Sequence, residues 1–235
     1  MKKKIITILI LLIIPLTLVG CTKTKTSEDA IAFKKDYESL NGKKNKNGKE
    51  YRKVSISKNN PIVITDAKTI IEMIENGESF YVYFGSKLCP WCRSVIEKAI
   101  EIANENEIDK IYYVDIWDDE GNEILRDKYT LDEDKEPALA NEGTEEYFKI
   151  LGYLNDILPD YTYAANKNGG DKLEVQEKRI YVPLFVYISK GKPIRETSGL
   201  SEKQKDSREK LTKEVLKDEE QLFDDFFINV CDESC

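Results

Sequence analysis

The chain has 235 residues, of which 36 are basic, 44 are acidic and none is histidine, so its formal net charge is −8. This acidic balance argues against nucleic acid or an anionic lipid surface as a partner recognised by charge. The length suits one domain with insertions, or one domain with an extension, and we expect a monomer.

The N-terminus carries the pattern of a bacterial export signal. Three lysines at positions 2–4 precede an almost wholly apolar stretch over 5–19, which is too short for a comfortable membrane span. We therefore predict a signal peptide over residues 1–20. The sequence at 18–21, Leu-Val-Gly-Cys, resembles the lipobox, whose cysteine becomes the lipidated first residue of a bacterial lipoprotein.

This resemblance predicts lipidation of Cys21 and a protein held at the bacterial cell membrane by a lipid anchor. The alternatives are an ordinary secretory signal in which Cys21 is incidental, and an uncleaved N-terminal anchor. In each case the rest of the chain is expected outside the cytoplasm, where disulfides are permitted.

Residues 21–58 are expected to be a tether and N-terminal extension of a main domain over 59–235. After a polar run, Ser27 predicts the start of a weak helix. Val54 and Ile56 predict a short strand. We expect the extension to be a spacer that docks on the main domain.

The main domain opens with alternating strand and helix patterns. The predicted strands are 62–64, 79–85 and 111–116. Thr65 or Asp66 predicts the start of a helix after the first strand, and Asn76-Gly77 predicts its end. This spacing predicts an α/β fold with a partly parallel, mixed sheet flanked by helices.

Cys89-Pro90-Trp91-Cys92 lies between the second strand and an amphipathic helix pattern. The first cysteine is expected at the helix N-terminus, where unpaired N–H groups and the helix dipole favour a thiolate. Pro90 fits the first helical turn. The spacing allows Cys92 to resolve a mixed disulfide formed by Cys89, so we predict a redox couple.

The alternatives for this motif are a structural disulfide and one half of a zinc site. Zinc sites usually combine a CxxC with a second pair of cysteines or histidines. The chain has no histidine, and its only other close cysteine pair is Cys231 and Cys235 at the C-terminus. We expect neither a metal nor a cofactor.

The C-terminal part predicts a hairpin and a closing helix. A strand over 181–188, with a proline near its start, precedes a turn and a partner strand over 194–197. After Gly199, residues 201–204 have the capping-box pattern that starts a long amphipathic helix. The predicted apolar stripe of this helix is Leu211, Val215, Leu216, Leu222, Phe223, Phe226 and Phe227.

This order of elements resembles the thioredoxin fold over about 61–118 and 180–230. The wider arrangement is similar to thioredoxin-like lipoproteins and bacteriocin-transport accessory proteins of Gram-positive bacteria. The resemblance implies that Val182-Pro183 is the family's cis-proline position beside the CxxC, where Pro183 contacts a peptide partner and keeps metals off the thiols. Trp91 is either a substrate-facing platform or a partly exposed aromatic on the helix rim.

The resemblance also implies the activity. We expect a thiol–disulfide oxidoreductase in which Cys89 is the nucleophile, Cys92 resolves, and protein thiols and disulfides are the partners. One alternative is a non-catalytic binding module of a secretion or bacteriocin system, with the CxxC as a structural disulfide. Another is a zinc protein with four thiolates.

Relative to this family, residues 119–179 are an insertion of about 60 residues. Its acidic start is expected to be a solvated surface rather than a calcium site, because no EF-hand pattern is present. Thr144 predicts the start of a helix. Residues 161–163 and 173–180 predict a hairpin, which either rises over the active site or only extends the sheet. The side chains expected to face the sheet are Tyr147, Phe148, Leu151, Leu154, Ile157 and Leu158.

Two features depart from thioredoxins. Tyr83 stands six positions before the first cysteine, where thioredoxins carry a buried acidic residue. Because the pKa of tyrosine is near 10, we expect water, Glu97 or Asp115 to carry the proton of Cys92 instead. The Pro-Trp dipeptide is more similar to glutaredoxins and periplasmic oxidases, which leaves the direction of the reaction open.

Cys231 and Cys235 would lie about 6 Å apart at their Cα atoms if the closing helix reached them, within the range of a disulfide. The acidic residues between them disfavour a helix end there. We therefore expect a small disulfide loop. This disulfide is either a local cross-link that protects the two thiols from oxidation or a second dithiol that exchanges electrons with Cys89 and Cys92.

Overall fold

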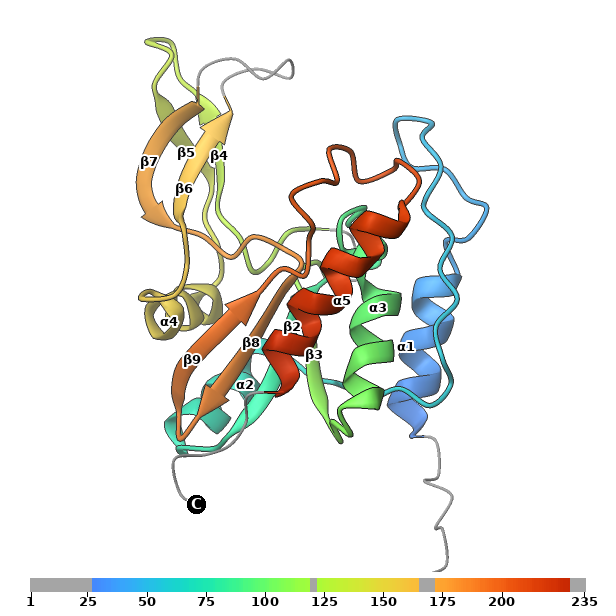
Figure 1. Cartoon of the computed structure of the whole chain (residues 1–235). Coiled ribbons are helices and arrows are strands. Elements are labelled where there is room, and N and C mark those ends of the chain that lie inside the picture. The colour runs from blue at the N-terminus through green and yellow to red at the C-terminus, as the bar shows by residue number, and fades with distance from the viewer. Residues whose placement is uncertain (1–26, 119–121, 165–171, 229–235) are drawn as a thin grey trace, which may run out of the picture.

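The computed structural model describes residues 27–118, 122–164 and 172–228. Its centre is a five-stranded mixed sheet in the order β1-β3-β2-β8-β9 (Figure 1). The first three strands of that order are parallel, and β8 and β9 are antiparallel to their neighbours. The strands are β1 (Ile62–Ile64), β2 (Phe80–Gly85), β3 (Ile111–Asp115), β8 (Leu184–Ser189) and β9 (Lys192–Thr197). The prediction of an α/β fold with a mixed sheet is confirmed.

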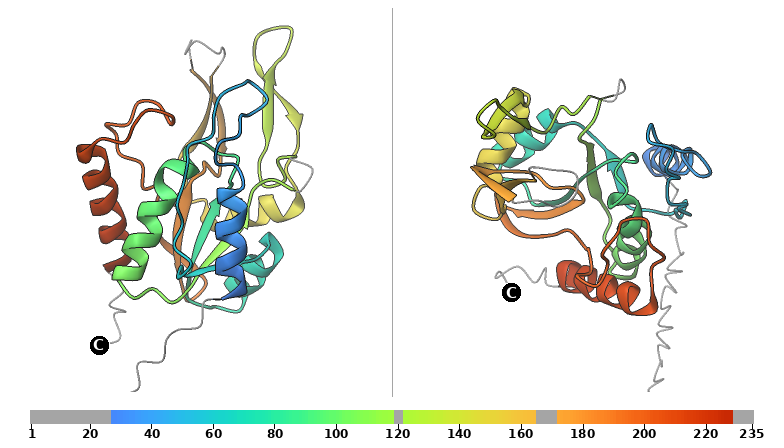
Figure 2. Two further views of the ribbon diagram at one scale, coloured as in Figure 1. Left: turned by 90° about the vertical axis from the view of Figure 1, so that its right-hand side faces the viewer. Right: turned by 90° about the horizontal axis from the view of Figure 1, so that it is seen from above.

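Helices cover both faces of this sheet (Figures 1 and 2). One face carries α1 (Glu28–Glu38), α3 (Cys92–Glu105) and α5 (Lys213–Ile228), and the other carries α2 (Ala67–Glu75) and α4 (Glu145–Leu154). Side-chain oxygens of Ser27, Asp66 and Thr144 accept backbone N–H groups three residues onward, at 3.0, 2.8 and 3.3 Å. The three helix starts predicted from these residues are confirmed.

The N-terminal extension is part of the core. Phe33 and Tyr37 of α1 are buried in the same apolar cluster as α3 and α5. Val54 and Ile56 are buried there as well, but the predicted strand at these two residues is wrong. The side chain of Asn41 bonds to both the N–H and the C=O of Val54, at 3.0 and 2.8 Å, so the backbone needs no neighbouring strand there.

The start of the closing helix differs from the prediction. Residues 201–204 do not cap a helix, because α5 begins at Lys213. The Ser201 hydroxyl instead donates to the carboxylate of Asp218 at 2.6 Å. The hydroxyl oxygen of Thr212 accepts the N–H of Val215 at 3.2 Å at the true start.

The apolar stripe of α5 is narrower than predicted. Phe223, Phe226 and Phe227 are buried in the core, whereas Leu216 and Leu222 are each 36% exposed. Gly199 lies directly against this helix with a positive φ of 66°. A Cβ atom at this position would lie 2.1 Å from Cζ of Phe223. Only glycine therefore allows the backbone to lie this close to α5.

Two hairpins stand beside α4 and extend beyond the sheet (Figure 1). The predicted hairpin is present as β6 (Asp160–Ala164) and β7 (Lys172–Lys178), and its turn lies outside the described residues. A second hairpin, β4 (Lys128–Leu131) and β5 (Pro137–Asn141), was not predicted.

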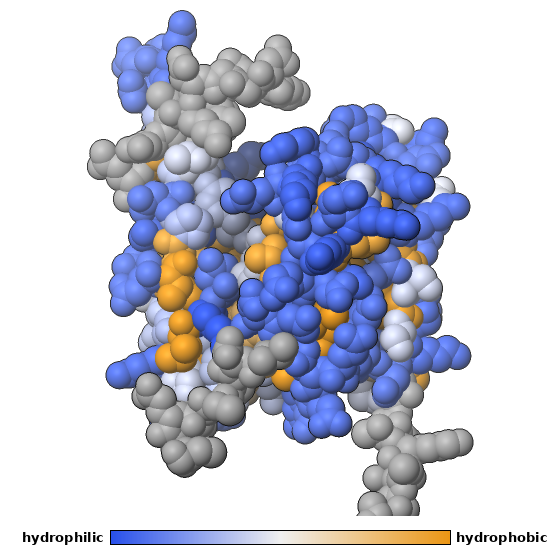
Figure 3. Space-filling view, in the orientation of Figure 1, coloured by the Kyte–Doolittle hydropathy of each residue, from blue (hydrophilic) through white to orange (hydrophobic). Residues whose placement is uncertain are grey.

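Helix α4 buries Tyr147, Ile150 and Leu154, but Phe148 is 40% exposed, contrary to the prediction. Ile194 of β9 is also exposed. Figure 3 shows small apolar patches on a face that is mostly hydrophilic. Within the described ranges, no helix combines the length and apolar character that crossing a membrane requires.

Glu219 gives the α3–α5 interface a pH dependence. Its side chain is fully buried, and its carboxyl oxygens have no hydrogen-bond partner within the described part of the chain. Burial raises the pKa of Glu219 from 4.5 to about 7, against the opposing charges of Arg52 and Lys98. The folded state therefore retains a proton that the unfolded state has lost, so this carboxyl destabilises the fold increasingly as the pH rises from about 4.5 to about 7.

We expect Glu219→Gln to raise the free energy of unfolding at pH 8 by about 1–3 kcal/mol and to change it little at pH 4. Urea denaturation at the two pH values measures the difference. Glu220→Gln is the matched control, since its side chain is exposed on the same turn. An equal effect of Glu219→Gln at both pH values would contradict the assignment.

Candidate active site

The CxxC motif lies where β2 ends and α3 begins. The N–H of Arg93 bonds to the carbonyl oxygen of Cys89 at 3.1 Å, which is the first bond of the helical ladder. The N–H of Cys92 points to Sγ of Cys89 at 3.3 Å. Cys89 therefore lies at the helix N-terminus, as predicted, and its side chain accepts an N–H of the first turn, although the regular helix begins at Cys92 and its N-cap residue is Trp91.

The two thiols have different surroundings. Cys89 is 6% exposed and Cys92 is fully buried. Hydrogen bonds from the Cys92 thiol and from the N–H groups of Cys92 and Trp91, with the charge of Arg126, lower the pKa of Cys89 despite its burial. Burial raises the pKa of Cys92 well above its ordinary value. Cys89 is the more exposed thiol, as predicted, and the opposite directions of the two pKa shifts agree with the predicted order of acidity.

The segment before β8 lies against the first thiol. Sγ of Cys89 is 3.7 Å from the carbonyl oxygen of Val182. The Val182–Pro183 peptide bond is cis, as predicted. β8 starts at Leu184, opposite Phe84 in β2, so Pro183 stands just before the strand rather than within it. Trp91 is half-buried beside the thiols.

Three buried tyrosines, Tyr37, Tyr83 and Tyr113, lie near Cys92 in the core. The Tyr83 hydroxyl lies 2.9 Å from the Tyr37 hydroxyl of α1, and the Tyr83 ring stacks between Tyr113 and Phe185, with centroids at 5.3 and 4.3 Å. A hydrogen bond from Tyr83 lowers the pKa of Cys92 against the larger effect of burial. A buried phenol, rather than a carboxylate, is thus the side chain that interacts with the Cys92 thiol from β2.

The two carboxylates expected near Cys92 are held by other groups. Asp115 accepts a hydrogen bond from the Tyr113 hydroxyl at 2.9 Å, and burial raises the pKa of Asp115. Glu97 is exposed and accepts the N–H of Ser55 at 2.6 Å, so it fastens the N-terminal extension to α3.

A variant with Tyr83→Phe tests the contact between phenol and thiol. We expect Cys92 to displace a chromogenic thiol from Cys89 roughly three- to tenfold more slowly at pH 7, because the loss of one hydrogen bond of about 1 kcal/mol leaves less Cys92 thiolate. Stopped-flow absorbance measures the rate across pH. Tyr112→Phe, on the opposite face of the sheet, is the control. A pH–rate profile unchanged by Tyr83→Phe would contradict this role.

A groove of about 980 Å³ runs beside the CxxC loop. Its walls come from α1, the loop at 45–47 and the residues Leu88, Asp115 and Trp117. Leu88 directly precedes Cys89, which itself does not line the groove. The N-terminal extension forms one wall, a role that its weak helical pattern did not indicate.

Several predicted features lie outside the described residues: lipidation at Cys21, the signal peptide at 1–20, and the disulfide between Cys231 and Cys235. They stay predictions. In the part of the chain that the structure describes, no cluster of three or more histidine, cysteine or acidic side chains could hold a metal ion. No family model and no curated protein sequence matches the chain.

Proposed function

We propose that the protein is an extracytoplasmic thiol–disulfide oxidoreductase, tethered to the bacterial membrane through a lipid on Cys21. Its fold is proposed to be thioredoxin-like, with residues 119–179 inserted before the strand that follows Pro183. The strand order and directions support this topology, as does the position of Val182 beside Cys89.

The proposed reaction begins when the Cys89 thiolate attacks one sulfur of a substrate disulfide. A new S–S bond joins Cys89 to the substrate, and the other substrate sulfur leaves as a thiolate that takes a proton from water. Cys92 then loses its proton and attacks Sγ of Cys89, which frees the second substrate thiol. Two electrons pass to the substrate, and the reverse sequence oxidises a substrate dithiol.

The observation that carries the proposal is the placement of Sγ of Cys89 between the N–H of Cys92, at 3.3 Å, and the carbonyl oxygen of Val182, at 3.7 Å. The N–H of Cys92 favours the thiolate. The carbonyl oxygen of Val182, to which the protonated thiol can donate, is a main-chain group that can bind an extended peptide once Cys89 is ionised. The test is the reduction of a protein disulfide by the prereduced protein. Turnover that is lost in Cys89→Ala supports the proposal, and equal rates for both proteins would contradict it.

The proposed anchor has its own test. Wild-type protein expressed in a Gram-positive host is expected to incorporate labelled palmitate and to remain with the membrane fraction. Cys21→Ser is expected to abolish the label, because only the thiol of that residue can accept the lipid in this scheme. Label that persists in Cys21→Ser would remove the anchor from the proposal without affecting the redox site.

A further inference from the structure

A second pocket, of about 590 Å³, lies between the hairpins and the segment that follows β3. Among the described residues, its charged lining side chains are Arg126, Lys128 and Arg179, with Glu123 as the one carboxylate, and the amides of Asn122 and Asn141 also line it. The buried carboxylate of Asp127 is close in sequence, but it is not part of the lining and accepts the N–H of Gly143 at 2.8 Å. The pocket is therefore cationic in a chain whose net charge is −8.

Aromatic rings hold both arginines in place. The guanidinium carbon of Arg179 lies 4.1 Å from the ring centroid of Tyr161 and 5.7 Å from that of Tyr181. The guanidinium carbon of Arg126 lies 6.0 Å from the Trp117 ring. Stacked guanidinium groups are pre-organised for planar anions such as carboxylates, because few side-chain rotamers remain to be fixed on binding.

The charges of these arginines are incompletely satisfied. Nε of Arg126 and Nε of Arg179 are buried and have no hydrogen-bond partner among the residues that the structure describes. Glu123 is 3.6 Å from Arg126, beyond a good hydrogen bond, and among the described residues no carboxylate forms an ion pair with Arg179. Burial and the charge of Arg126 both lower the pKa of Arg179. A bound anion would offset these two positive charges.

The pocket is connected to the thiol site by short stretches of chain. Arg179 is three residues before Val182, a separation of at most about 11 Å, and Val182 contacts Sγ of Cys89. Trp117 lines both the pocket and the groove beside Leu88. A peptide whose cysteine reaches Cys89 therefore has neighbouring residues within reach of the two arginines.

We propose that this pocket binds a carboxylate side chain of the disulfide-bearing protein substrate, so that acidic residues near the substrate cysteine select it. The inference rests on the proposed function. Paired hydrogen bonds from a guanidinium match the two oxygens of a carboxylate. Protein substrates carry such groups as aspartate and glutamate, so the substrate class is proteins with acidic residues flanking the reactive cysteine.

The test uses two short peptides that differ only in having glutamate or glutamine on both sides of one cysteine. In each, the cysteine is joined by a disulfide to thionitrobenzoate, whose release reports attack by Cys89. We expect the glutamate peptide to react about tenfold faster with the full-length protein, as one charge-assisted contact allows. The ratio of the two rates is independent of how much Cys89 is ionised, because both peptides meet the same thiolate.

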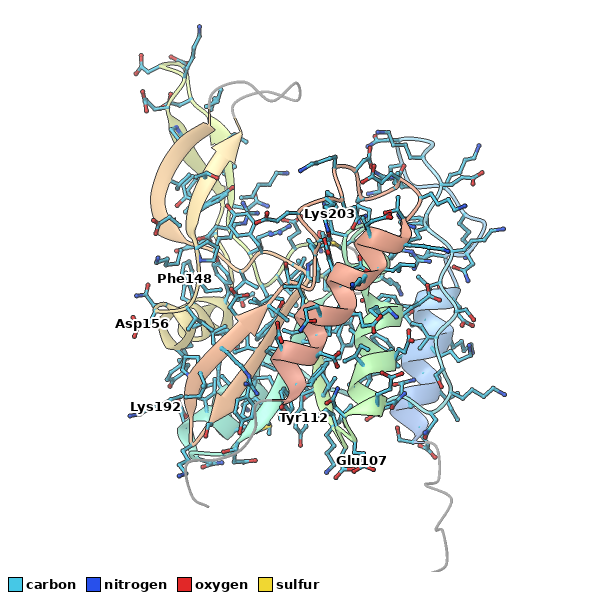
Figure 4. All side chains as sticks on the ribbon, viewed as in Figure 1. Glu107, Tyr112, Phe148, Asp156, Lys192 and Lys203 are labelled. Atoms are coloured by element: carbon cyan, nitrogen blue, oxygen red, sulfur yellow. The ribbon has the colours of Figure 1, made fainter. Side chains whose placement is uncertain are left out.

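The ratio is expected to fall to about one in Arg126→Gln and in Arg179→Gln, and to stay unchanged in Lys192→Gln, which removes a positive charge at the distant β8–β9 turn (Figure 4). The glutamine peptide shows in each variant whether the thiol site is intact. Equal rates for the two peptides with wild-type protein, or a ratio unaffected by both arginine variants, would overturn the proposal while leaving thiol exchange intact.

Reaction with neither peptide would contradict the proposed function instead. In that case, forms of the peptides with serine in place of cysteine decide the pocket separately. Tighter binding of the glutamate form, measured by fluorescence anisotropy and lost in Arg179→Gln, supports the pocket. Equal binding of the two forms overturns it.

Discussion

Cys92→Ser is expected to accumulate mixed disulfides between Cys89 and protein substrates, whereas Cys89→Ser is expected to form none. The reason is the difference between the two thiols: Cys89 has a lowered pKa and lies beside Val182, and Cys92 is fully buried with a raised pKa. In Cys92→Ser the first attack still occurs, but the resolving thiol next to Cys89 that releases the substrate is missing. Turnover should fall to the background rate in both variants.

Non-reducing gels followed by mass spectrometry of the trapped adducts measure this difference. The double variant, Cys89→Ser with Cys92→Ser, controls for disulfides formed by other cysteines. Equal alkylation rates for the two thiols in the wild-type protein, with no adduct in either single variant, would remove the assignment of nucleophile and resolving thiol.

Arg93→Ala is expected to cause the largest loss of stability, about 3–5 kcal/mol. Arg93 is fully buried, and its guanidinium donates to the carbonyl oxygens of Arg52 and Tyr37, each at 2.8 Å, and to the side-chain oxygen of Asn41 at 2.9 Å. These bonds join α3 to the N-terminal extension. Their loss leaves the carbonyl oxygens of Arg52 and Tyr37 without this donor, while the side-chain oxygen of Asn41 keeps the N–H of Val54, so the extension should separate from the core first.

Urea denaturation gives the free energy of unfolding, and limited proteolysis shows whether cleavage begins within 40–58. Arg208→Ala is the matched control, because that side chain is exposed and should change stability by no more than about 0.5 kcal/mol. A loss below about 1 kcal/mol in Arg93→Ala would show that the guanidinium does not hold the extension in place.

Local patterns predicted much of the fold. The caps at Ser27, Asp66 and Thr144 and the apolar runs of β2 and β3 are short-range signals, and the structure confirms them. Short-range signals were insufficient at residues 201–204, where the capping-box pattern was misleading because Ser201 bonds to Asp218 across the fold. A local pattern does not reveal such a competing distant partner.

The candidate site was predictable only in part for the same reason. The CxxC and Val182-Pro183 stand out in the sequence, whereas the contact of Tyr37 with Tyr83 joins residues 46 positions apart. Nothing near Tyr37 distinguishes it from an ordinary core residue of an amphipathic helix. Arg126 and Arg179 likewise come together only through the hairpins, one of which was not predicted.

The reduction potential of the Cys89–Cys92 couple tests the central proposal most directly. Equilibration of the purified protein with glutathione buffers, followed by alkylation and mass spectrometry, gives the fraction oxidised at each potential. The proposed function predicts a value between about −270 and −120 mV, the range of exchange-active couples. A value below about −300 mV would indicate a structural disulfide and contradict the proposal.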